Sequence, residues 1–249
     1  MSINAERILA VRTEKTIYKD RDTVLKVFGP GYTQSHVLHE AMNQAQMKEV
    51  GLPVPEVLEV VRMEDKWAIR SAYIPGKTMY RLSTEQPEQF AQYFDLFLDI
   101  QMEILSKSIR LLSNLKDELH RIVINSALEA TVRYELHARL QAMPTEKAIC
   151  HGDFNPSNII IDPNGKYWVL DWAHATQGNP EADVAMTYLW LLQNGQAELA
   201  EVYLERYGEK SGIPRQRVER WIPIVAAAQS VSATAEKRAF LLDLVKFTE

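Results

Sequence analysis

Cysteine is almost absent from this sequence of 249 residues, which contains Cys150 alone. A single cysteine excludes an intramolecular disulfide and a zinc site built on cysteines, and it is typical of proteins from a reducing compartment. Long apolar runs are missing too, because the longest, such as residues 222–228, fall far short of the ~20 residues that span a bilayer. Residues 1–7 hold no signal-like apolar segment. We therefore expect a cytoplasmic protein without a membrane partner.

Positively charged residues are also fewer than negatively charged ones. Lysine and arginine number 28 against 33 aspartates and glutamates, which gives a formal net charge of −5. Proteins that bind the phosphate backbone of nucleic acids are usually basic, so we expect no nucleic-acid partner. The hydrophobic fraction of 46% and the charged fraction of 24% are those of a globular protein. The length fits one large domain or two modest lobes.

Internal repeats and linkers rich in glycine and serine are missing as well, so the organisation has to follow from the hydrophobic pattern. Short apolar or alternating stretches predict strands. These stretches are residues 8–11, 16–18, 23–28, 57–62 and 67–73. Between the third and the fourth, Thr33 or Ser35 caps a predicted helix that runs to about Val50. The first third of the chain is therefore predicted to be a small sheet with one helix.

The rest of the chain has mainly helical periodicity. Residues 87–105 carry apolar side chains at helical spacing, and residues 115–140 predict one helix or two. Four aromatic residues of the first stretch are predicted to lie in the core: Phe90, Tyr93, Phe94 and Phe97. Helices return from Pro180 onward, where Trp190 and Trp221 are expected to pack in the core, with the lining of a cleft as the alternative.

A short hairpin interrupts the helical part. Residues 159–161 and 167–170 are predicted strands around an Asp-Pro-Asn-Gly turn at residues 162–165. The chain is thus predicted to have an α+β fold with two lobes. The N-terminal lobe, residues 1–73, is a small antiparallel sheet with one helix, and the larger C-terminal lobe, residues 74–249, is mainly helical.

Three oxygen-bearing side chains surround this hairpin. Asp153 and Asn158 lie on the loop that leads into it, and Asp171 follows its second strand. Because a hairpin brings its two ends together, Asn158 and Asp171 are expected to be neighbours, and their oxygens suit Mg²⁺ that also binds nucleotide phosphates. Asp153 is then free to accept a proton from an attacking hydroxyl group. Taken singly, such residues are ordinary in turns, so the hypothesis depends on their combination.

Residues 150–161 read Cys-His-Gly-Asp-Phe-Asn-Pro-Ser-Asn-Ile-Ile-Ile, and residues 169–172 read Val-Leu-Asp-Trp. The pattern His-x-Asp-x-x-x-x-Asn, followed by a metal-binding aspartate, is typical of kinases. In the form found here it resembles the aminoglycoside phosphotransferase and choline kinase-like family, and the resemblance extends over nearly the whole chain. It implies a protein-kinase-like fold of two lobes. It also implies phosphate transfer from Mg-ATP to a hydroxyl group of a small molecule.

The resemblance implies a role for each residue of the loop that matches the family pattern. Asp153 would be the catalytic base, and Asn158 and Asp171 would be the ligands of Mg²⁺. His151 would organise the loop. Asp183, in the segment Gly-Asn-Pro-Glu-Ala-Asp, would brace the loop from the helix that follows.

For the N-terminal lobe, the resemblance makes Lys26 the residue that holds the α- and β-phosphates, with Glu40 as the partner that orients it. Ser71 and Tyr73, in the hinge between the lobes, would hold the adenine through their backbone. ATP is the predicted nucleotide and GTP the alternative. One departure concerns residues 11–16, which contain no glycine where kinases carry a G-x-G-x-x-G loop. How the phosphates are covered therefore stays open.

We predict an ATP-dependent phosphotransferase whose acceptor is an aminoglycoside, an amino alcohol, a sugar or a related metabolite, and we expect a monomer or a weak homodimer. One alternative is an inert, nucleotide-binding pseudokinase that serves as an interaction module, against which the complete set of five site residues argues. Another is an atypical protein kinase. Gly152 in place of arginine, and a segment from Asp171 to Pro180 that is too short for an activation segment, argue against it.

Overall fold

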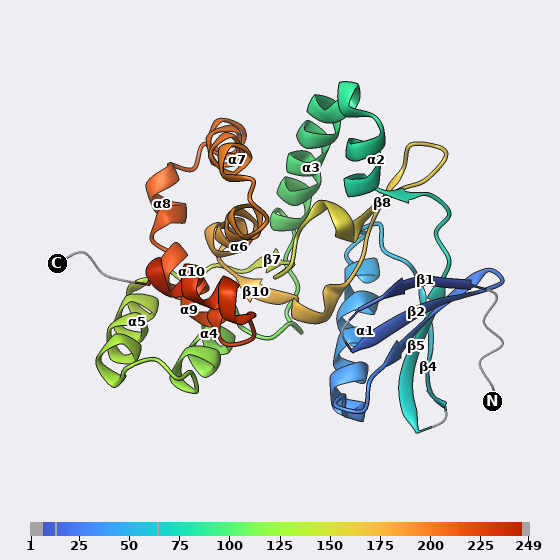
Figure 1. Ribbon diagram of the computed structural model, residues 1–249, viewed down its shortest axis with the longest axis horizontal. Helices are drawn as coiled ribbons and strands as arrows, with labels where there is room; N and C mark the ends of the chain where they lie inside the picture. Colours follow the sequence, from blue (N-terminus) through green and yellow to red (C-terminus); the bar gives the residue numbers. More distant parts are fainter. Residues whose placement is uncertain (1–6, 13, 64, 246–249) are drawn as a thin grey trace. The chain divides into compact units, whose positions relative to one another are not determined.

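The computed structural model describes residues 7–12, 14–63 and 65–245. Thr13, in the glycine-free stretch before Lys26, and residues 1–6 lie outside them. The chain divides into two compact units (Figure 1): the first comprises Met1–Tyr93 and Pro156–His174, and the second comprises Phe94–Asn155 and Ala175–Glu249. The division into lobes at residues 73 and 74 stays a prediction.

A five-stranded antiparallel sheet forms the centre of the first unit. Its strands are β1 (Arg7–Val11), β2 (Lys15–Asp20), β3 (Thr23–Phe28), β4 (Val57–Met63) and β5 (Lys66–Ala72). They are ordered β1-β2-β3-β5-β4, and every pair is antiparallel. This confirms the predicted sheet. Strand β3 is the middle one, and its Lys26 is paired with Ile17 on one side and Ile69 on the other.

Helix α1 (Gln34–Glu49) packs against this sheet (Figure 1). Of the two predicted caps, Thr33 is the one observed, because its hydroxyl oxygen accepts a hydrogen bond from the backbone N–H of His36 at 3.4 Å. The contact with the sheet is apolar and includes a cluster of Phe28, Val37, Ala41 and Ile69. Glu40 lies on the same helix and is buried as well, so its charge needs a partner.

A second, three-stranded sheet completes the first unit. It consists of β6 (Lys77–Thr78), β8 (Ile159–Ile161) and β9 (Tyr167–Val169), in the order β6-β8-β9. The predicted hairpin is confirmed as β8 and β9, whereas β6 and the short helix α2 (Met79–Glu85) were not expected from the sequence. Three 3₁₀ turns accompany these elements: η1 (Pro87–Gln89), η2 (Pro156–Asn158) and η3 (Trp172–His174).

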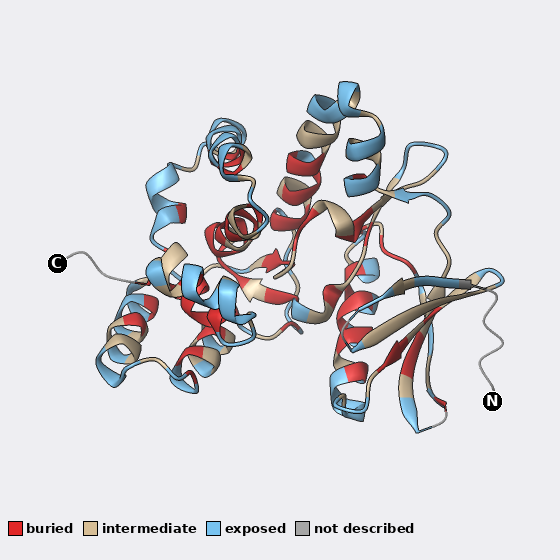
Figure 2. Cartoon of the chain, in the orientation of Figure 1, coloured by how far each residue is buried: buried red, intermediate tan, exposed pale blue. Residues whose placement is uncertain are grey.

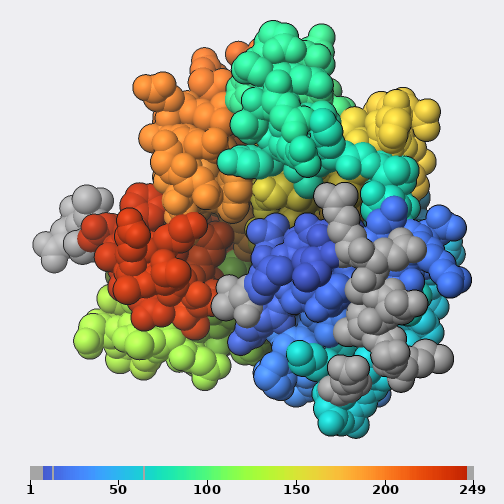
Figure 3. All heavy atoms as spheres, turned by 45° about the vertical axis from the view of Figure 1, so that its right-hand side comes forward, coloured from blue at the N-terminus to red at the C-terminus, as the bar shows by residue number. Residues whose placement is uncertain are grey.

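The second unit is mainly helical. Its helices are α3 (Phe90–Leu105, from residue 94 onward), α4 (Leu115–Ile124), α5 (Ala130–Ala142), α6 (Pro180–Gln193), α7 (Ala197–Ser211), α8 (Arg215–Glu219), α9 (Ile222–Ser230) and α10 (Ala235–Asp243). A small antiparallel pair, β7 (Ala148–Cys150) and β10 (Thr176–Gly178), was not expected from the sequence. Figure 2 shows that α6 and α9 are largely buried. In Figure 3 the helices from α6 onward form one group of atoms, coloured orange to red.

The predicted aromatic core of α3 is only partly correct. Phe97 is 3% exposed and stacks on Phe154 with ring centroids 4.6 Å apart, but Phe90 is 41% exposed because it begins the helix. Trp221 is buried as expected, whereas Trp190 is half-buried. Within the described residues, no helix combines the length and the apolar character needed to cross a membrane.

Candidate active site

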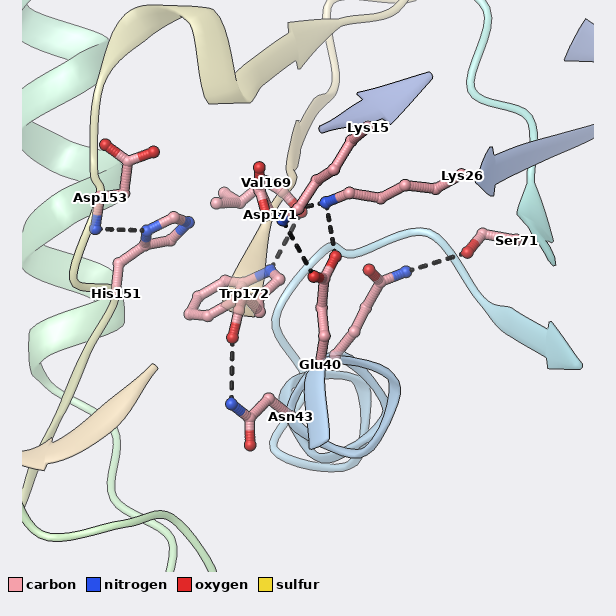
Figure 4. Close-up of polar contacts among 11 residues, drawn as sticks. Lys15, Lys26, Glu40, Asn43, Ser71, His151, Asp153, Val169, Asp171 and Trp172 are labelled. Carbon is pink, nitrogen blue, oxygen red and sulfur yellow. Dashed lines mark hydrogen bonds and ion pairs between the residues drawn. The ribbon is translucent and has the colours of Figure 1, made fainter. Parts of the chain in front are cut away.

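Lys26 joins two carboxylates in the first unit (Figure 4). Its Nζ atom lies 2.5 Å from Oε1 of Glu40 and 2.9 Å from Oδ1 of Asp171. Burial lowers the pKa of Lys26, but the charges of Asp171 and Glu40 outweigh it and raise the pKa above its ordinary value. The side chain is therefore a fixed positive charge at neutral pH. The structure thus brings together three residues that are far apart in the sequence.

The backbone around Asp171 explains how this carboxylate reaches Lys26. Strand β9 ends at Val169, and the N–H of Leu170 donates a hydrogen bond of 2.8 Å to the carbonyl of Asn158. Asp171 then adopts a left-handed conformation with φ of 62°. Only a few residue types other than glycine tolerate this region, aspartate among them, and such conformations gather at functional sites. The turn out of the strand therefore sets the direction of the Asp171 side chain.

Asn158 and Asp171 lie at the same end of the hairpin, as predicted. Asn158 ends the 3₁₀ turn η2, directly before β8, and Ile159 is paired with Val169. Asn158 is buried, whereas the Asp171 side chain is 34% exposed.

These two side chains offer one amide oxygen and one carboxylate. No group of three or more His, Cys, Asp or Glu in the described part of the chain is arranged to hold a metal. This donor set suits Mg²⁺, which takes one or two carboxylates from a protein and completes its shell with water and phosphate oxygens. The residues present therefore fit the predicted ion.

The two residues predicted to hold the adenine lie on β5 and just after it. The hydroxyl oxygen of Ser71 accepts a hydrogen bond from Nε2 of Gln44 at 3.4 Å. The backbone N–H of Tyr73 donates to the carbonyl of Asp22 at 2.9 Å, and Nζ of Lys19 lies 4.5 Å from the centre of the Tyr73 ring. Their part in adenine binding stays a prediction.

Lys15 is a member of the cluster that the sequence did not indicate. Its Nζ atom donates to Oε2 of Glu40 at 3.3 Å and lies 5.3 Å from the ring centres of both Phe28 and Tyr32. Glu40 therefore shares its carboxylate between two lysines (Figure 4). The predicted hairpin could have indicated this position, because Lys15 lies opposite Phe28 on the neighbouring strand and cross-strand neighbours are in contact.

Asn43 was missed as well. It lies three residues after Glu40 on α1, and its Nδ2 donates a hydrogen bond of 3.1 Å to the carbonyl of Trp172. Residues three apart share one face of a helix. The face of α1 that presents Glu40 thus also fixes the chain next to Asp171.

In the second unit, the loop after β7 carries His151, Gly152 and Asp153. His151 is fully buried, and its Nδ1 accepts a hydrogen bond of 3.2 Å from the backbone N–H of Asp153. Gly152 has a φ of 82°, a conformation that glycine adopts without strain. The backbone conformation at residue 152 therefore favours glycine over the arginine that kinases carry at this place.

Asp183, on α6, accepts a hydrogen bond of 2.7 Å from the N–H of Gly152. Its second oxygen accepts from Nε2 of Gln101 at 3.3 Å. Burial raises the pKa of the Asp183 carboxyl, and the bond from Gly152 offsets part of that effect. The structure therefore places Asp183 against the backbone of the loop, where a bracing residue is expected.

Asp153 is half-buried, and Nδ2 of Asn155 donates to its Oδ1 at 3.1 Å. Asp153 also lines a cavity of about 200 Å³ within the second unit. A carboxylate beside a cavity can receive a proton from a bound hydroxyl group.

Cys150 precedes this loop and is fully buried. Burial raises the pKa of its thiol well above the ordinary value, and the charge of Asp183 adds to this. Because the thiolate is the nucleophilic form, Cys150 is a packing residue.

Residues 11–221 match the sequence model of the phosphotransferase enzyme family, abbreviated APH. The chain belongs to this family. The match confirms the resemblance carried by residues 150–172 and includes every residue of the clusters described above. No curated protein sequence matches this phosphotransferase.

Solved structures confirm the fold of the phosphotransferase. The apo form of a thermostable mutant of aminoglycoside phosphotransferase APH(4)-Ia is similar with a TM-score of 0.70 and 18% identity, over 96% of this chain and 91% of that chain. A ternary complex of a mutant of the same enzyme with ADP and hygromycin B gives 0.69 and 16%, over 96% and 90%. Choline kinase LicA from Streptococcus pneumoniae gives 0.66 and 17%, over 98% and 93%. Family and fold together assign the chain as a small-molecule phosphotransferase with an α+β, kinase-like two-lobe fold.

Proposed function

We propose that this phosphotransferase moves the γ-phosphate of ATP to a hydroxyl group of a small molecule, with Mg²⁺ bound by Asn158 and Asp171. The observation that carries the proposal is the position of Lys26 between Glu40 and Asp171, at 2.5 and 2.9 Å. Kinases use such a lysine to hold the phosphates and such an aspartate to hold the metal. The complex of a structurally similar enzyme with ADP and hygromycin B supports a nucleotide and a small-molecule acceptor.

Lys26 contributes a fixed positive charge toward the phosphate oxygens, and Glu40 keeps its ammonium group in place. Bound Mg²⁺ supplies further positive charge that offsets the charge of the transferring phosphate. Ser71 and Tyr73 hold the adenine of ATP through their backbone, with GTP as the alternative nucleotide. Catalysis then consists mainly of positioning and electrostatic stabilisation.

Asp153 receives the proton of the acceptor's hydroxyl group. The hydroxyl oxygen bonds to the γ-phosphorus of ATP, the bond between the γ-phosphorus and the oxygen that links it to the β-phosphate breaks, and ADP leaves. The hydrogen bond from Asn155 holds one oxygen of Asp153, so the carboxylate has a defined direction. His151 and Asp183 position the loop through its backbone N–H groups. We place the enzyme in the cytoplasm, since its one thiol suits a reducing compartment. We propose a monomer or a weak homodimer as its oligomeric state.

The proposal is tested by Asp153→Asn, with Asp99→Asn as the matched control because Asp99 is a surface residue paired with Lys210. Consumption of ATP is measured with a panel of hydroxylated compounds, and nucleotide binding is measured by thermal shift. We expect Asp153→Asn to bind Mg-ATP as the wild type does and to lose roughly 10²–10⁴-fold in turnover. Full turnover by this variant would overturn the role of Asp153. Nucleotide binding without any acceptor-dependent consumption would indicate an interaction module instead.

A further inference from the structure

The described residues that line the cavity beside Asp153 all belong to the second unit. Asp153 contributes its carboxylate, and Trp190, Gln193, Gln229 and Lys237 contribute side chains from α6, α9 and α10. If Asp153 is the base of the proposed reaction, the acceptor has to occupy this cavity. The chemistry of the lining then indicates which acceptors fit.

The size of the cavity limits the enclosed part of the acceptor. Its volume is about 200 Å³. An engineered cavity of about 150 Å³ holds a benzene molecule, and pockets for drug-sized ligands begin at about 300 Å³. The cavity therefore suits a single six-membered ring with its substituents.

The charges of the lining argue against a cationic acceptor. Among the described residues of the lining, Asp153 is the one carboxylate and Lys237 the one cation. Lys237 is half-buried and has no ion-pair partner among the described residues. With the acceptor hydroxyl at Asp153, a protonated amine in this space would meet the ammonium group of Lys237 and find no second carboxylate among the described residues of the lining. An anionic group would instead gain a charge-assisted hydrogen bond from Lys237.

Two amides provide further polar contacts. Nε2 of Gln193 donates to Oε1 of Gln229 at 2.9 Å and to the carbonyl of Leu189 at 3.2 Å. In the described part of the chain, this leaves the oxygen of Gln193 and the NH₂ group of Gln229 without partners. An adjacent acceptor and donor match hydroxyl groups, which both donate and accept. Trp190 adds an apolar surface for the carbon skeleton of a ring.

We infer that the acceptor is a polyhydroxylated carboxylic acid whose enclosed part is about the size of one sugar ring. One hydroxyl group faces Asp153, the carboxylate pairs with Lys237, and further hydroxyl groups bind Gln193 and Gln229. This inference rests on the proposed function, because it takes Asp153 as the base.

The test uses two matched sets of ring-sized compounds: glucuronate, glucose and glucosamine, and galacturonate, galactose and galactosamine. Acceptor-dependent ATP consumption by the full chain gives kcat/KM for each. Within each set we expect the acid to exceed the neutral sugar by roughly tenfold or more, and the amine to be the poorest, because a hydrogen bond between two charged groups is worth more than a neutral one. An amine that equals or exceeds its acid overturns the inference and leaves the proposed function standing.

Lys237→Gln and Lys237→Arg test the residue itself, with Lys210→Gln as the control on another helix of the same unit. The ratio of kcat/KM for acid over neutral sugar is expected to fall roughly tenfold in Lys237→Gln, to recover in Lys237→Arg and to stay unchanged in Lys210→Gln. An unchanged ratio in Lys237→Gln overturns the inference.

Binding of the acids to Asp153→Asn, followed by thermal shift, separates the two proposals. Binding that depends on Lys237, without turnover in the wild type, supports the ligand class and contradicts the phosphotransfer proposed for this site. Absence of binding by both acids contradicts the ligand class.

Discussion

Lys26 and Asp171 form an ion pair of 2.9 Å although 145 positions separate them in the chain. The pair connects the middle strand of the five-stranded sheet to the turn that follows the hairpin of β8 and β9. Both residues belong to the first unit, so this half of the proposed chemistry is assembled by one compact body. Its consequences can be tested one residue at a time.

Lys26→Met is expected to lower turnover by roughly 10²–10³-fold, the usual effect of removing one group that stabilises transition-state charge. Lys15→Met is the matched control, because Lys15 pairs with Glu40 at 3.3 Å, whereas Lys26 pairs with both Glu40 and Asp171. It leaves Lys26 bound to both carboxylates, so a smaller loss is expected. Steady-state ATP consumption measures both variants. Equal losses would show that Lys26 has no special part in phosphate binding.

Asp171→Asn is expected to abolish the stabilisation that Mg-ATP gives. Asparagine tolerates the left-handed backbone of residue 171, so the variant removes the charge and preserves the fold. Mg-ATP at 100 times its dissociation constant stabilises a binder by about 2.7 kcal/mol, and a thermal shift with and without EDTA detects its loss. Asp65→Asn is the control, because Asp65 also has a positive φ, of 65°, but is exposed. A full Mg²⁺-dependent shift in Asp171→Asn would contradict the metal assignment.

Gly152→Ala is expected to lower the free energy of unfolding by roughly 1–2 kcal/mol, the cost of a side chain in the left-handed region. Gly208→Ala provides the contrast, because Gly208 lies inside α7 without a positive φ and its added methyl group would meet Ile213 at an ordinary contact distance. Alanine favours a helix over glycine, so this variant is expected to be neutral or stabilising. Urea unfolding measures both. Equal stability of Gly152→Ala and the wild type would rule out a backbone requirement at this position.

The raised pKa of the buried Asp183 carboxyl leads us to expect that the stability of the protein depends on pH. Burial raises the pKa of Asp183 in the folded state above the unfolded value of about 3.9. Between the two pKa values the folded state binds more protons than the unfolded state, so the free energy of unfolding falls as the pH rises. The contribution is complete below about pH 3.9 and is lost as the pH passes the folded pKa. We therefore expect the stability of the wild type relative to Asp183→Asn to decline across this window.

Asp95→Asn is the control for this measurement, because it predicts the opposite slope. The hydrogen bond from Arg206 lowers the pKa of Asp95, so its contribution is present above the unfolded pKa and is lost as the pH falls. Urea unfolding across a pH series distinguishes the two. A relative stability of Asp183→Asn that does not change with pH would contradict the raised pKa.

Local sequence signals predicted most of the fold. The hairpin of β2 and β3, the cap at Thr33 and the hairpin of β8 and β9 follow from turn residues and periodicity, which act over a few positions. Helix α2 was missed because Met79 is its one buried residue, so it has no apolar periodicity to detect. The pairing of β7 with β10 joins strands of three residues that are more than twenty positions apart, and no local pattern encodes such a register.

The residues of the site likewise differ in whether the sequence could predict them. The motif at residues 151–158 and the strand after it indicated Asp153, Asn158 and Asp171, because kinase chemistry fixes their spacing. Lys15 and Asn43 contribute through contacts that depend on strand register and helix face, which appear only when the chain is folded. Trp190 was predicted to pack in the core, with the lining of a cleft as the alternative, and the structure favours the alternative because Trp190 lines the cavity beside Asp153.

The rate at which the buried thiol of Cys150 is alkylated can measure how often the second unit opens. Cys150 is the only cysteine of the chain, so an alkylating reagent that adds mass to the intact protein can have reacted with no other thiol. Burial and the raised pKa of the thiol suppress that reaction in the closed state, so labelling has to pass through an opened state. The labelling rate therefore reports the free energy of opening three residues from Asp153. A compound that occupies the neighbouring cavity should slow the rate, which makes acceptor binding measurable without nucleotide, metal or catalysis.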